Sequence, residues 1–377
     1  MPHSDLPANQ TATLSRYGAL AVLTLTGVML VGAWQIIAAA VDPAGLEFPR
    51  NWLDFRQGRS TGALEKQLDQ KLPARSTLIG AANSVRYLLT GSGGEQVRTG
   101  KHGWLFLTEE LRFDADGSAN LKARAELLGA ASRSLERQGV RLIVALVPDK
   151  ARVYSSMLAT GRYPDYNSPR YANALSAFHK QGVTTVNLLP PLVQAASQAE
   201  VYYRTDTHWN QIGAKVAAEA VASTIKQLGQ ELQKTSFSSK KAAPVERPGD
   251  LIRLMGLGDT AHMLGLQPDA EAPETTLQVG ADSADLLGDN AVQVVLTGTS
   301  YSLRANFVGY LQQSLSAKVL NAAKDGGGFL EATTLYLKNE AFNSSKPKVL
   351  VWEVPERYLW GQQNESHGWL RNVCLTP

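Results

Sequence analysis

The amino-acid sequence predicts an α/β protein with a mainly parallel sheet, preceded by a membrane-spanning helix. Short apolar runs rich in β-branched residues alternate with segments whose apolar residues recur at helical spacing. This alternation is typical of a parallel sheet flanked by helices. A long uncharged stretch near the N-terminus predicts the membrane span. The composition, with 44% hydrophobic and 19% charged residues, is that of a globular protein.

The segment from Tyr17 to Val41 contains no charged residue. As a helix it is long enough to cross about 30 Å of hydrocarbon. It exceeds the core of a cleaved signal peptide, about 7–15 residues, which favours an uncleaved signal anchor. The small residues Ala38–Ala40 keep cleavage open as an alternative. The flanking charges favour a cytoplasmic N-terminus and place the remaining chain in the periplasm, at the outer face of an inner membrane. The predicted regions are a cytoplasmic N-terminus (1–17), a transmembrane signal anchor (18–41), a juxtamembrane region (42–99) and a catalytic domain (100–377).

The elements of the α/β domain follow from length and periodicity. The predicted strands are 141–148, 184–189, 291–298, 317–323 and 347–355. The predicted helices cover 121–135, 170–181, 211–225, 303–316 and 329–338. The polar, proline-bearing stretch 233–249 is predicted to be a surface loop or insertion. In such sheets ligands bind beyond the carboxyl ends of the strands, so the residues that follow the strands are the candidates for chemistry.

Several classes of function are excluded or disfavoured. The net charge of +3 is too small to indicate nucleic-acid binding, and there is no run of Lys and Arg. The single cysteine, Cys374, excludes intramolecular disulfides and a cysteine-based zinc site. Neither a nucleotide loop nor a coenzyme A signature is visible, so we expect no cofactor and no metal.

Ser300 follows the apolar strand 291–298 and precedes a helical segment. A strand–turn–helix corner exposes the serine hydroxyl and directs backbone N–H groups at the same point, which suits an oxyanion. The local sequence differs from the G-x-S-x-G of the nucleophile elbow. As an alternative, Thr299, Ser300 and Ser302 are candidate helix N-caps.

The stretch "VYYRTDTHWN" places Asp206 and His208 on one short loop between a strand-like segment and a helix. Serine needs a base to become nucleophilic, and histidine titrates closest to neutral pH. A carboxylate then orients the imidazole and stabilises its charged form. The alternative is that Asp206, Thr207 or Asn210 only caps the helix that follows.

The motifs "GWLFL", "VPDK", "YYRTDTHWN", "GTSYS" and "VLVWEVPER" occur in the order found in the alginate O-acetyltransferase family of the J and X type, and the chain resembles that family over about residues 100–360. The family has an SGNH-hydrolase-like fold and includes relatives that acetylate cellulose. As in this group, the Asp/His block precedes the serine block, whereas ordinary SGNH hydrolases have the opposite order. The resemblance implies Ser300 as nucleophile, His208 as base and Asp206 as its orienting carboxylate.

By their order, "KDGGG" and "WEVPER" correspond to the SGNH blocks that line the oxyanion hole. Gly326, Gly327 and above all Gly328 are candidate backbone donors, with a flexible turn as the alternative. The second block lacks the asparagine of generic SGNH enzymes. Arg357 is a candidate replacement, unless it pairs with Glu353 or Glu356.

Other polar and aromatic residues are weaker candidates for substrate contact. Tyr301 and Arg204 are assigned to the oxyanion or substrate site, and Tyr203 flanks the Asp/His loop. Lys150 and Arg152 follow the first strand and either meet an acidic sugar or are solvated. The side chains of Trp104, Trp209 and Trp352 either stack on sugar rings or belong to the core.

The resulting prediction is an O-acetyltransferase that acts on an exopolysaccharide, alginate or cellulose, through a serine acyl-enzyme. The resemblance implies that a membrane-bound acyltransferase partner supplies the acetyl group and that other exopolysaccharide-assembly subunits cooperate. Two alternatives remain: a periplasmic carbohydrate acetylesterase with the same triad, and a non-catalytic polysaccharide-binding assembly subunit.

Overall fold

The computed structural model describes residues 74–280 and 292–361, together with a few residues between 26 and 37. The chain divides into two compact units, residues 1–83 and 84–377, and helix α4 (Ala74–Thr90) crosses from one to the other. Most of the predicted anchor 18–41 and the stretch 42–73 lie outside the described residues. Among the described helices, none combines the length and the apolar character needed to cross a bilayer.

A parallel five-stranded sheet forms the centre of the second unit, with strand order β10-β9-β11-β3-β4. Every neighbouring pair in this sheet is parallel. The strands are β3 (Arg141–Val147), β4 (Thr184–Asn187), β9 (Val294–Thr297), β10 (Val319–Asn321) and β11 (Val349–Pro355). The predicted parallel sheet is therefore confirmed, and each of its strands lies inside a range predicted from the sequence.

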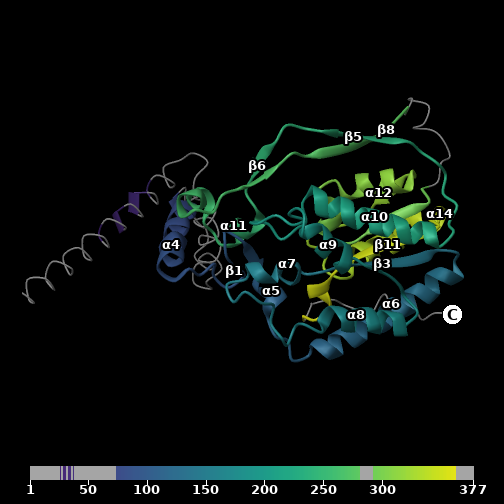
Figure 1. The fold of residues 1–377 in the computed structure, drawn as a ribbon, viewed down its shortest axis with the longest axis horizontal. Coiled ribbons are helices and arrows are strands. Elements are labelled where there is room, and N and C mark those ends of the chain that lie inside the picture. The colour runs from purple at the N-terminus through teal and green to yellow at the C-terminus, as the bar shows by residue number, and fades with distance from the viewer. Residues whose placement is uncertain are drawn as a thin grey trace, which may run out of the picture. The chain divides into compact units, whose positions relative to one another are not determined.

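Alternate residues along each central strand enter two different hydrophobic cores, because successive side chains of a strand point to opposite faces. In β3, for example, Ile143 and Ala145 belong to one core and Leu142 and Val144 to the other. The strands are apolar on both faces because helices cover both (Figure 1). The first face carries α7 (Lys150–Val153), α9 (Leu189–Ala196), α10 (Gln211–Gln227) and α12 (Phe307–Leu315). The second carries α6 (Gly117–Arg137), α8 (Arg170–Lys180), α13 (Glu331–Lys338) and α14 (Glu340–Ser344).

Two predicted elements differ from the structure. The helix expected over 303–316 begins only at Phe307, because the 3₁₀ turn η4 (Ser300–Leu303) and the left-handed residues Ala305 and Asn306 come first. The strand-like segment 201–204 joins no sheet and forms only an isolated bridge between Tyr202 and Trp209. Val201 and Tyr202 of this segment are nevertheless buried in the first hydrophobic core.

The polar stretch 233–249 is part of a larger ordered region. Strand β5 (Phe237–Lys241) pairs with β8 (Glu274–Gln278), and β6 (Val245–Arg247) pairs with β7 (Asp269–Glu271), both antiparallel. Between the two arms lie α11 (Asp250–Leu254) and the 3₁₀ helix η2 (Gly258–Leu264). We call residues 237–278 the strap, since its strands arch over α10 and α12 (Figure 1).

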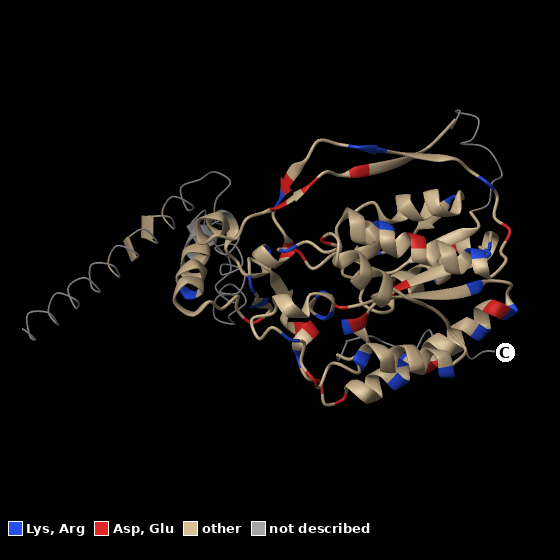
Figure 2. Ribbon diagram, in the orientation of Figure 1, with Lys and Arg blue, Asp and Glu red and all other residues tan. Residues whose placement is uncertain are grey.

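The remaining elements border the carboxyl ends of the sheet strands. Strands β1 (Val97–Thr99) and β2 (Leu105–Leu107) form an antiparallel pair. The short helices are α5 (Thr108–Leu111), η1 (Ser155–Met157) and η5 (Glu356–Leu359). Charged residues of both signs are distributed over the strap and the helices (Figure 2).

Candidate active site

Three residues predicted from the sequence form one hydrogen-bonded chain. The His208 Nε2 atom lies 2.7 Å from the Ser300 hydroxyl, and its Nδ1 atom lies 2.6 Å from Asp206 Oδ1. Ser300 begins the turn η4, three positions after the last residue of β9, and Asp206 and His208 lie on the loop before α10. All three side chains are largely buried, and Ser300 retains 9% exposure. The structure thus brings together the residues that the sequence predicts as nucleophile, base and orienting acid.

The Asp206 carboxylate accepts hydrogen bonds from four directions. Its Oδ1 atom accepts from the His208 backbone N–H at 3.0 Å and from the ring Nδ1–H. Its Oδ2 atom accepts from the Asp250 N–H at 3.2 Å and faces Arg247 at 3.5 Å. Burial opposes ionisation, but the bonds and charge of His208 outweigh it and hold the pKa of Asp206 well below its usual range. An ionised Asp206 fixes the proton of His208 on Nδ1, which leaves Nε2 free to accept the Ser300 proton.

The turn that carries Ser300 is built around a buried glutamate. Glu353, on β11, accepts from the Thr299 N–H at 2.7 Å and from the hydroxyls of Thr299 and Ser302 at 3.0 Å. Burial raises the pKa of Glu353, although these bonds partly offset the effect. Gly298 has φ 152°, and a Cβ there would lie 2.6 Å from Glu353 Oε2. Only glycine therefore lets the strand approach Glu353 this closely.

For each of the two loops, the structure supports both sequence interpretations, helix capping and the catalytic arrangement. Thr299 caps η4 by accepting from the Tyr301 N–H, and Asn210 caps α10 by accepting from the N–H groups of Ile212 and Gly213. Thr207, another candidate cap, instead donates its N–H and hydroxyl to Asp250. Capping and catalytic geometry are thus compatible, because they use different residues of each loop.

Lys150 holds the Asp/His loop through hydrogen bonds to its backbone. Its side chain is completely buried, and Nζ donates to the carbonyl oxygens of Leu105, Arg204 and Asp206 at 2.7, 2.9 and 2.9 Å. Burial lowers the pKa of Lys150 to about 8, although nearby carboxylates oppose the shift. Neither sequence expectation for Lys150, contact with an acidic sugar or solvation, is correct, because all three of its donors face buried carbonyls.

The sequence interpretation missed the strap as part of the site. Asp250, the first residue of α11, accepts two bonds from Thr207, and its Oδ2 lies 3.5 Å from His208 Nδ1. A Cβ on Gly249 would lie 1.9 Å from the Thr205 carbonyl oxygen, so the strap contacts the loop backbone directly. The only local signal was a glycine–aspartate helix start in the stretch "RPGD", which does not reveal its partner.

The residues Asp206, His208 and Asp250 offer ligand atoms close enough together to hold a metal ion. The donor set, however, is already engaged in hydrogen bonds. His208 uses Nδ1 toward Asp206 and Nε2 toward Ser300, and Asp250 binds Thr207. This arrangement fits a proton relay better than a metal centre.

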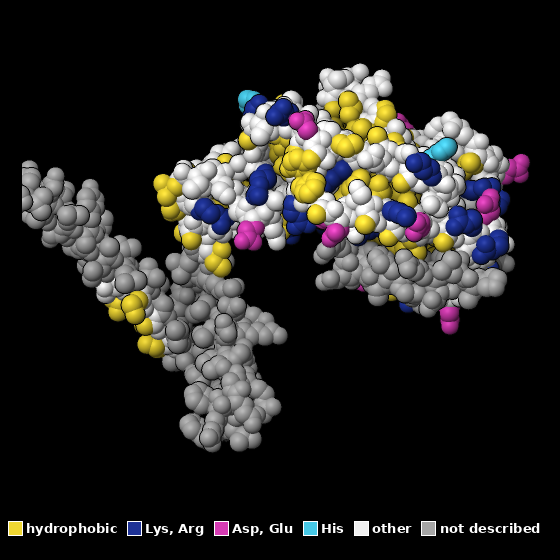
Figure 3. All heavy atoms as spheres, turned by 90° about the horizontal axis from the view of Figure 1, so that it is seen from below, with side chains coloured by type: hydrophobic (Ala, Val, Ile, Leu, Met, Phe, Trp, Pro, Cys, Tyr) yellow, Lys and Arg dark blue, Asp and Glu magenta, His cyan; other side chains and the backbone are white. Residues whose placement is uncertain are grey.

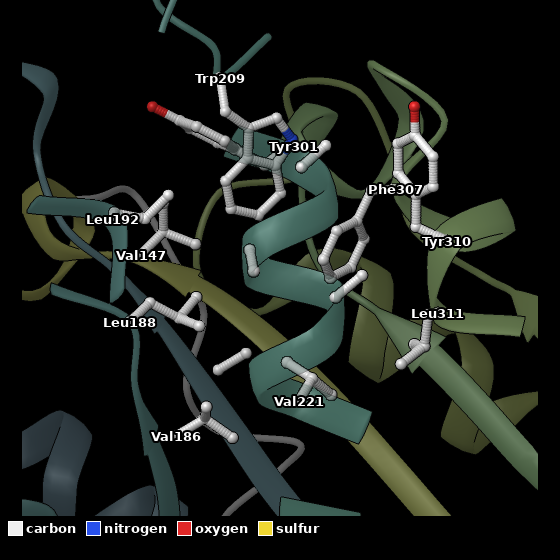
Figure 4. Packing of buried hydrophobic residues seen from close by; sticks show 14 of the residues in the cluster. Val147, Val186, Leu188, Leu192, Trp209, Val221, Tyr301, Phe307, Tyr310 and Leu311 are labelled. Atoms are coloured by element: carbon white, nitrogen blue, oxygen red, sulfur yellow. The ribbon is translucent and has the colours of Figure 1, made fainter. Parts of the chain in front are cut away.

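The remaining predicted site residues lie in different places. Tyr301 is fully buried, donates its hydroxyl to the Thr207 carbonyl at 2.8 Å, and packs edge-on against Trp209 (Figure 4). It therefore supports the His208 loop and is not exposed to substrate, contrary to its assignment. Arg357 lies with its guanidinium 5.5 Å from the Tyr301 ring and 3.8 Å from Glu109. It does not form an ion pair with Glu353 or Glu356 within the described part of the chain.

Arg204 is half exposed and pairs with Glu200 at 2.5 Å. With Tyr203 it lines a cavity of about 730 Å³ between α10 and the strap, which none of the three relay residues lines. The loop that holds Gly328 is tied to the serine turn, because the Lys324 N–H donates to the Gly298 carbonyl. The Gly327 N–H is occupied by the Lys324 carbonyl. The role of Gly326 or Gly328 as an oxyanion donor stays a prediction.

The three tryptophans considered for sugar stacking, Trp104, Trp209 and Trp352, are buried in the hydrophobic cores. Arg152 pairs with the buried Glu356 at 2.5 Å and packs over Tyr163. Both observations place these side chains in the framework behind the site. The coloured part of the face in Figure 3 carries basic, acidic and apolar side chains.

Comparison with known proteins identifies the family. Residues 97–356 match the family model described as "SGNH hydrolase-like domain, acetyltransferase AlgX". The chain is 31% identical over 347 residues to the probable alginate O-acetylase AlgJ of Pseudomonas syringae pv. tomato, covering 90% of this chain and 88% of the relative. It is 33% identical to the AlgJ of Azotobacter vinelandii, with 89% and 87% covered.

A solved structure leads to the same result. The O-acetyltransferase domain of Pseudomonas putida AlgJ superposes with a TM-score of 0.66 at 31% identity, covering 74% of this chain and 98% of that domain. Sequence and fold comparisons therefore agree. The chain belongs to the AlgX family of SGNH hydrolase-like acetyltransferase domains.

Proposed function

We propose that this chain is an alginate O-acetyltransferase that works through an acetyl-Ser300 intermediate. The observation that carries the proposal is the unbroken chain of hydrogen bonds from Ser300 through His208 to Asp206. The family membership supports acetyl transfer as the reaction, and the names of the AlgJ relatives support alginate, more than cellulose, as the acceptor.

In the first half-reaction, Ser300 Oγ attacks the acetyl carbonyl carbon of the donor while His208 Nε2 takes the hydroxyl proton. The imidazolium, stabilised by Asp206, then returns this proton to the leaving group. The Ser300 N–H has no acceptor among the described residues, which makes it a candidate donor to the oxyanion. In the second half-reaction, a sugar hydroxyl attacks the acetyl ester, and His208 transfers the sugar proton to Ser300 Oγ.

The site requires an acetyl donor from outside the chain. We propose that a membrane-bound acyltransferase partner delivers it to the periplasmic face, where this domain is held by the signal anchor 18–41. The uncharged sequence of the anchor supports this placement. A C-terminal reporter fusion that is active only in the cytoplasm would contradict it.

The test uses the purified full chain in detergent with p-nitrophenyl acetate as donor and an alginate oligosaccharide as acceptor. We expect the oligosaccharide to gain acetyl groups and the peptide that contains Ser300 to gain one acetyl group transiently. Release of acetate without sugar acetylation would favour the esterase alternative. Undiminished alginate acetylation by Ser300→Ala in cells would refute a catalytic role and favour an assembly subunit.

A further inference from the structure

The strap places a second carboxylate beside the ring nitrogen that Asp206 orients. Asp250 Oδ2 lies 3.5 Å from His208 Nδ1, and Asp206 Oδ1 lies 2.6 Å from the same atom. Asp250 is separated from the catalytic loop by more than forty positions in the sequence, and the strap alone brings it there.

The position of Asp250 is fixed on several sides. Its two carboxylate oxygens accept the Thr207 N–H at 2.8 Å and the Thr207 hydroxyl at 2.5 Å. Its own N–H donates to Asp206 Oδ2, and the next residue, Leu251, donates its N–H to the Thr205 carbonyl at 3.1 Å. These bonds hold the carboxylate against the loop, so that it cannot turn away from the imidazole without breaking them.

The Thr207 hydroxyl links Asp250 to the imidazole. Because this hydroxyl donates to Asp250, its oxygen presents a lone pair toward His208 Nδ1, which lies 3.2 Å away. Three oxygen acceptors therefore surround one ring nitrogen. Each of them favours the same tautomer, with the proton on Nδ1 and the lone pair of Nε2 directed at Ser300.

We propose that Asp250 is a second positioning carboxylate for His208, which keeps the imidazole oriented and stabilises its charged form together with Asp206. Asp250 acts through His208 and does not contact the reacting atoms. The inference rests on the proposed Ser300–His208–Asp206 relay and extends it to a residue of the strap.

The charged groups around the imidazole set the electrostatic expectation. Asp206 and Asp250 face Nδ1, and Arg247 lies behind Asp206, at 3.5 Å from its Oδ2. On the other sides, the buried Arg357 lies behind Tyr301, and Lys150 binds the Asp206 carbonyl. Removing the Asp250 charge favours the neutral imidazole, because it removes a nearby anion that stabilises the imidazolium.

The strap also provides a matched control. Asp269, on β7, binds the same loop through the Arg204 N–H at 2.7 Å and the Thr205 N–H at 3.0 Å. It also accepts the Thr205 hydroxyl at 2.5 Å, and among the described residues it has no contact with His208. Asp269→Asn therefore measures the effect of weakening the contact between the strap and the loop without removing a carboxylate beside His208.

The experiment is a double-mutant cycle on the full chain, with acetylation of an alginate oligosaccharide from p-nitrophenyl acetate as the assay. The four proteins are the unchanged chain, Asp206→Ala, Asp250→Asn and the double variant. Because either carboxylate can orient the ring, we expect the double variant to lose roughly tenfold or more beyond the product of the single losses in kcat. Asp250→Asn should also move the acidic limb of the kcat/KM profile to lower pH, and Asp250→Glu should restore it. Asp269→Asn should lower the unfolding temperature without moving that limb.

Single losses that simply multiply, or an equal shift of the acidic limb in Asp269→Asn, would overturn the assignment of Asp250. If Ser300→Ala remains fully active in the same assay, the relay itself fails. If Ser300→Ala is inactive and the cycle shows no coupling, only the role of Asp250 fails.

Discussion

Replacing Lys150 with methionine tests whether the buried ammonium organises the catalytic loop. The substitution keeps a long, unbranched side chain and removes the three donated bonds to Leu105, Arg204 and Asp206. The Arg204 carbonyl still accepts the Leu105 N–H at 2.9 Å, so two carbonyls lose the donor they depend on. A buried carbonyl left without a partner costs about 1–3 kcal/mol.

Relief of the ammonium's desolvation offsets part of this cost, whereas loss of its cation–π contacts with the rings of Trp104 and Phe106 adds to it. We therefore expect the free energy of unfolding to fall by about 2 kcal/mol, which lowers the unfolding temperature by roughly 4–8 °C for a domain of this size. The Asp206 carbonyl is one of the freed groups, and a small displacement of Asp206 disturbs the imidazole. We expect kcat to fall by roughly 10–100-fold.

The measurements are thermal unfolding followed by circular dichroism, and steady-state acetyl transfer. Lys348→Met is the matched control, because the exposed Lys348 also donates to a carbonyl, that of Glu231 at 2.6 Å. It should change neither quantity, since water replaces a donor at an exposed carbonyl. If Lys150→Met unfolds at the same temperature as the unchanged chain and keeps its kcat, the loop does not depend on Lys150.

Three further predictions concern the surroundings of the relay. Tyr301→Phe removes the hydrogen bond to the Thr207 carbonyl, so we expect the free energy of unfolding to fall by about 1–2 kcal/mol and kcat for acetyl transfer to fall roughly tenfold. Unchanged kinetics would show that the loop is held without this bond. Gly249→Ala should lower the free energy of unfolding by about 1–3 kcal/mol and lower kcat, because its Cβ would collide with the Thr205 carbonyl. Gly361→Ala is the control, since its Cβ would meet neighbouring atoms only at ordinary contact distance. Equal stability of the two variants would contradict the close approach at Gly249. Burial raises the pKa of Glu110 from 4.5 to about 7, so the folded chain holds a proton that the unfolded chain loses between these values, and its contribution to stability declines as pH rises through this window. In Glu110→Gln this decline should disappear, so the unfolding temperature of the variant should rise relative to that of the unchanged chain between pH 5 and 7. If the unfolding temperatures of the two proteins change in parallel with pH, Glu110 is not buried in its protonated form.

The strands and the relay could be predicted from the sequence because their signals are local. Each strand is a short apolar run, and the positions that follow the strands of a parallel sheet converge at one edge. Ser300 stands at such a position, after β9. The Asp206–His208 pair follows the segment 201–204, which joins no sheet, so its signal was the acid and the imidazole just before a helix. His208 and Ser300, more than ninety positions apart, nevertheless meet at 2.7 Å. The serine turn itself was less predictable, since the left-handed Ala305 and Asn306 that delay α12 carry no clear sequence signal.

The strap and Lys150 could not be placed from the sequence, for a different physical reason. Both make hydrogen bonds from a polar side chain to backbone groups that are distant in the sequence. Neither the spacing of apolar residues nor the residue types of turns indicates which distant groups will pair. Asp250 looks like an ordinary acid at a helix start, and Lys150 looks like a solvated base after a strand. Only the fold shows that the first faces the imidazole and the second faces three carbonyls.

These distant contacts decide how far the catalytic acid depends on its own loop. Two of the donors to Asp206 belong to His208 and are supplied by the loop itself. The other two, the Asp250 N–H and the Arg247 guanidinium, come from the strap. A buried carboxylate stays ionised only when its oxygens accept hydrogen bonds. The charge state of Asp206 therefore depends on both the Asp/His loop and the strap. Substitutions in the strap should therefore alter the relay even though they change no residue of the relay itself. The strap, whose role was not visible in the sequence, is thus part of the catalytic unit.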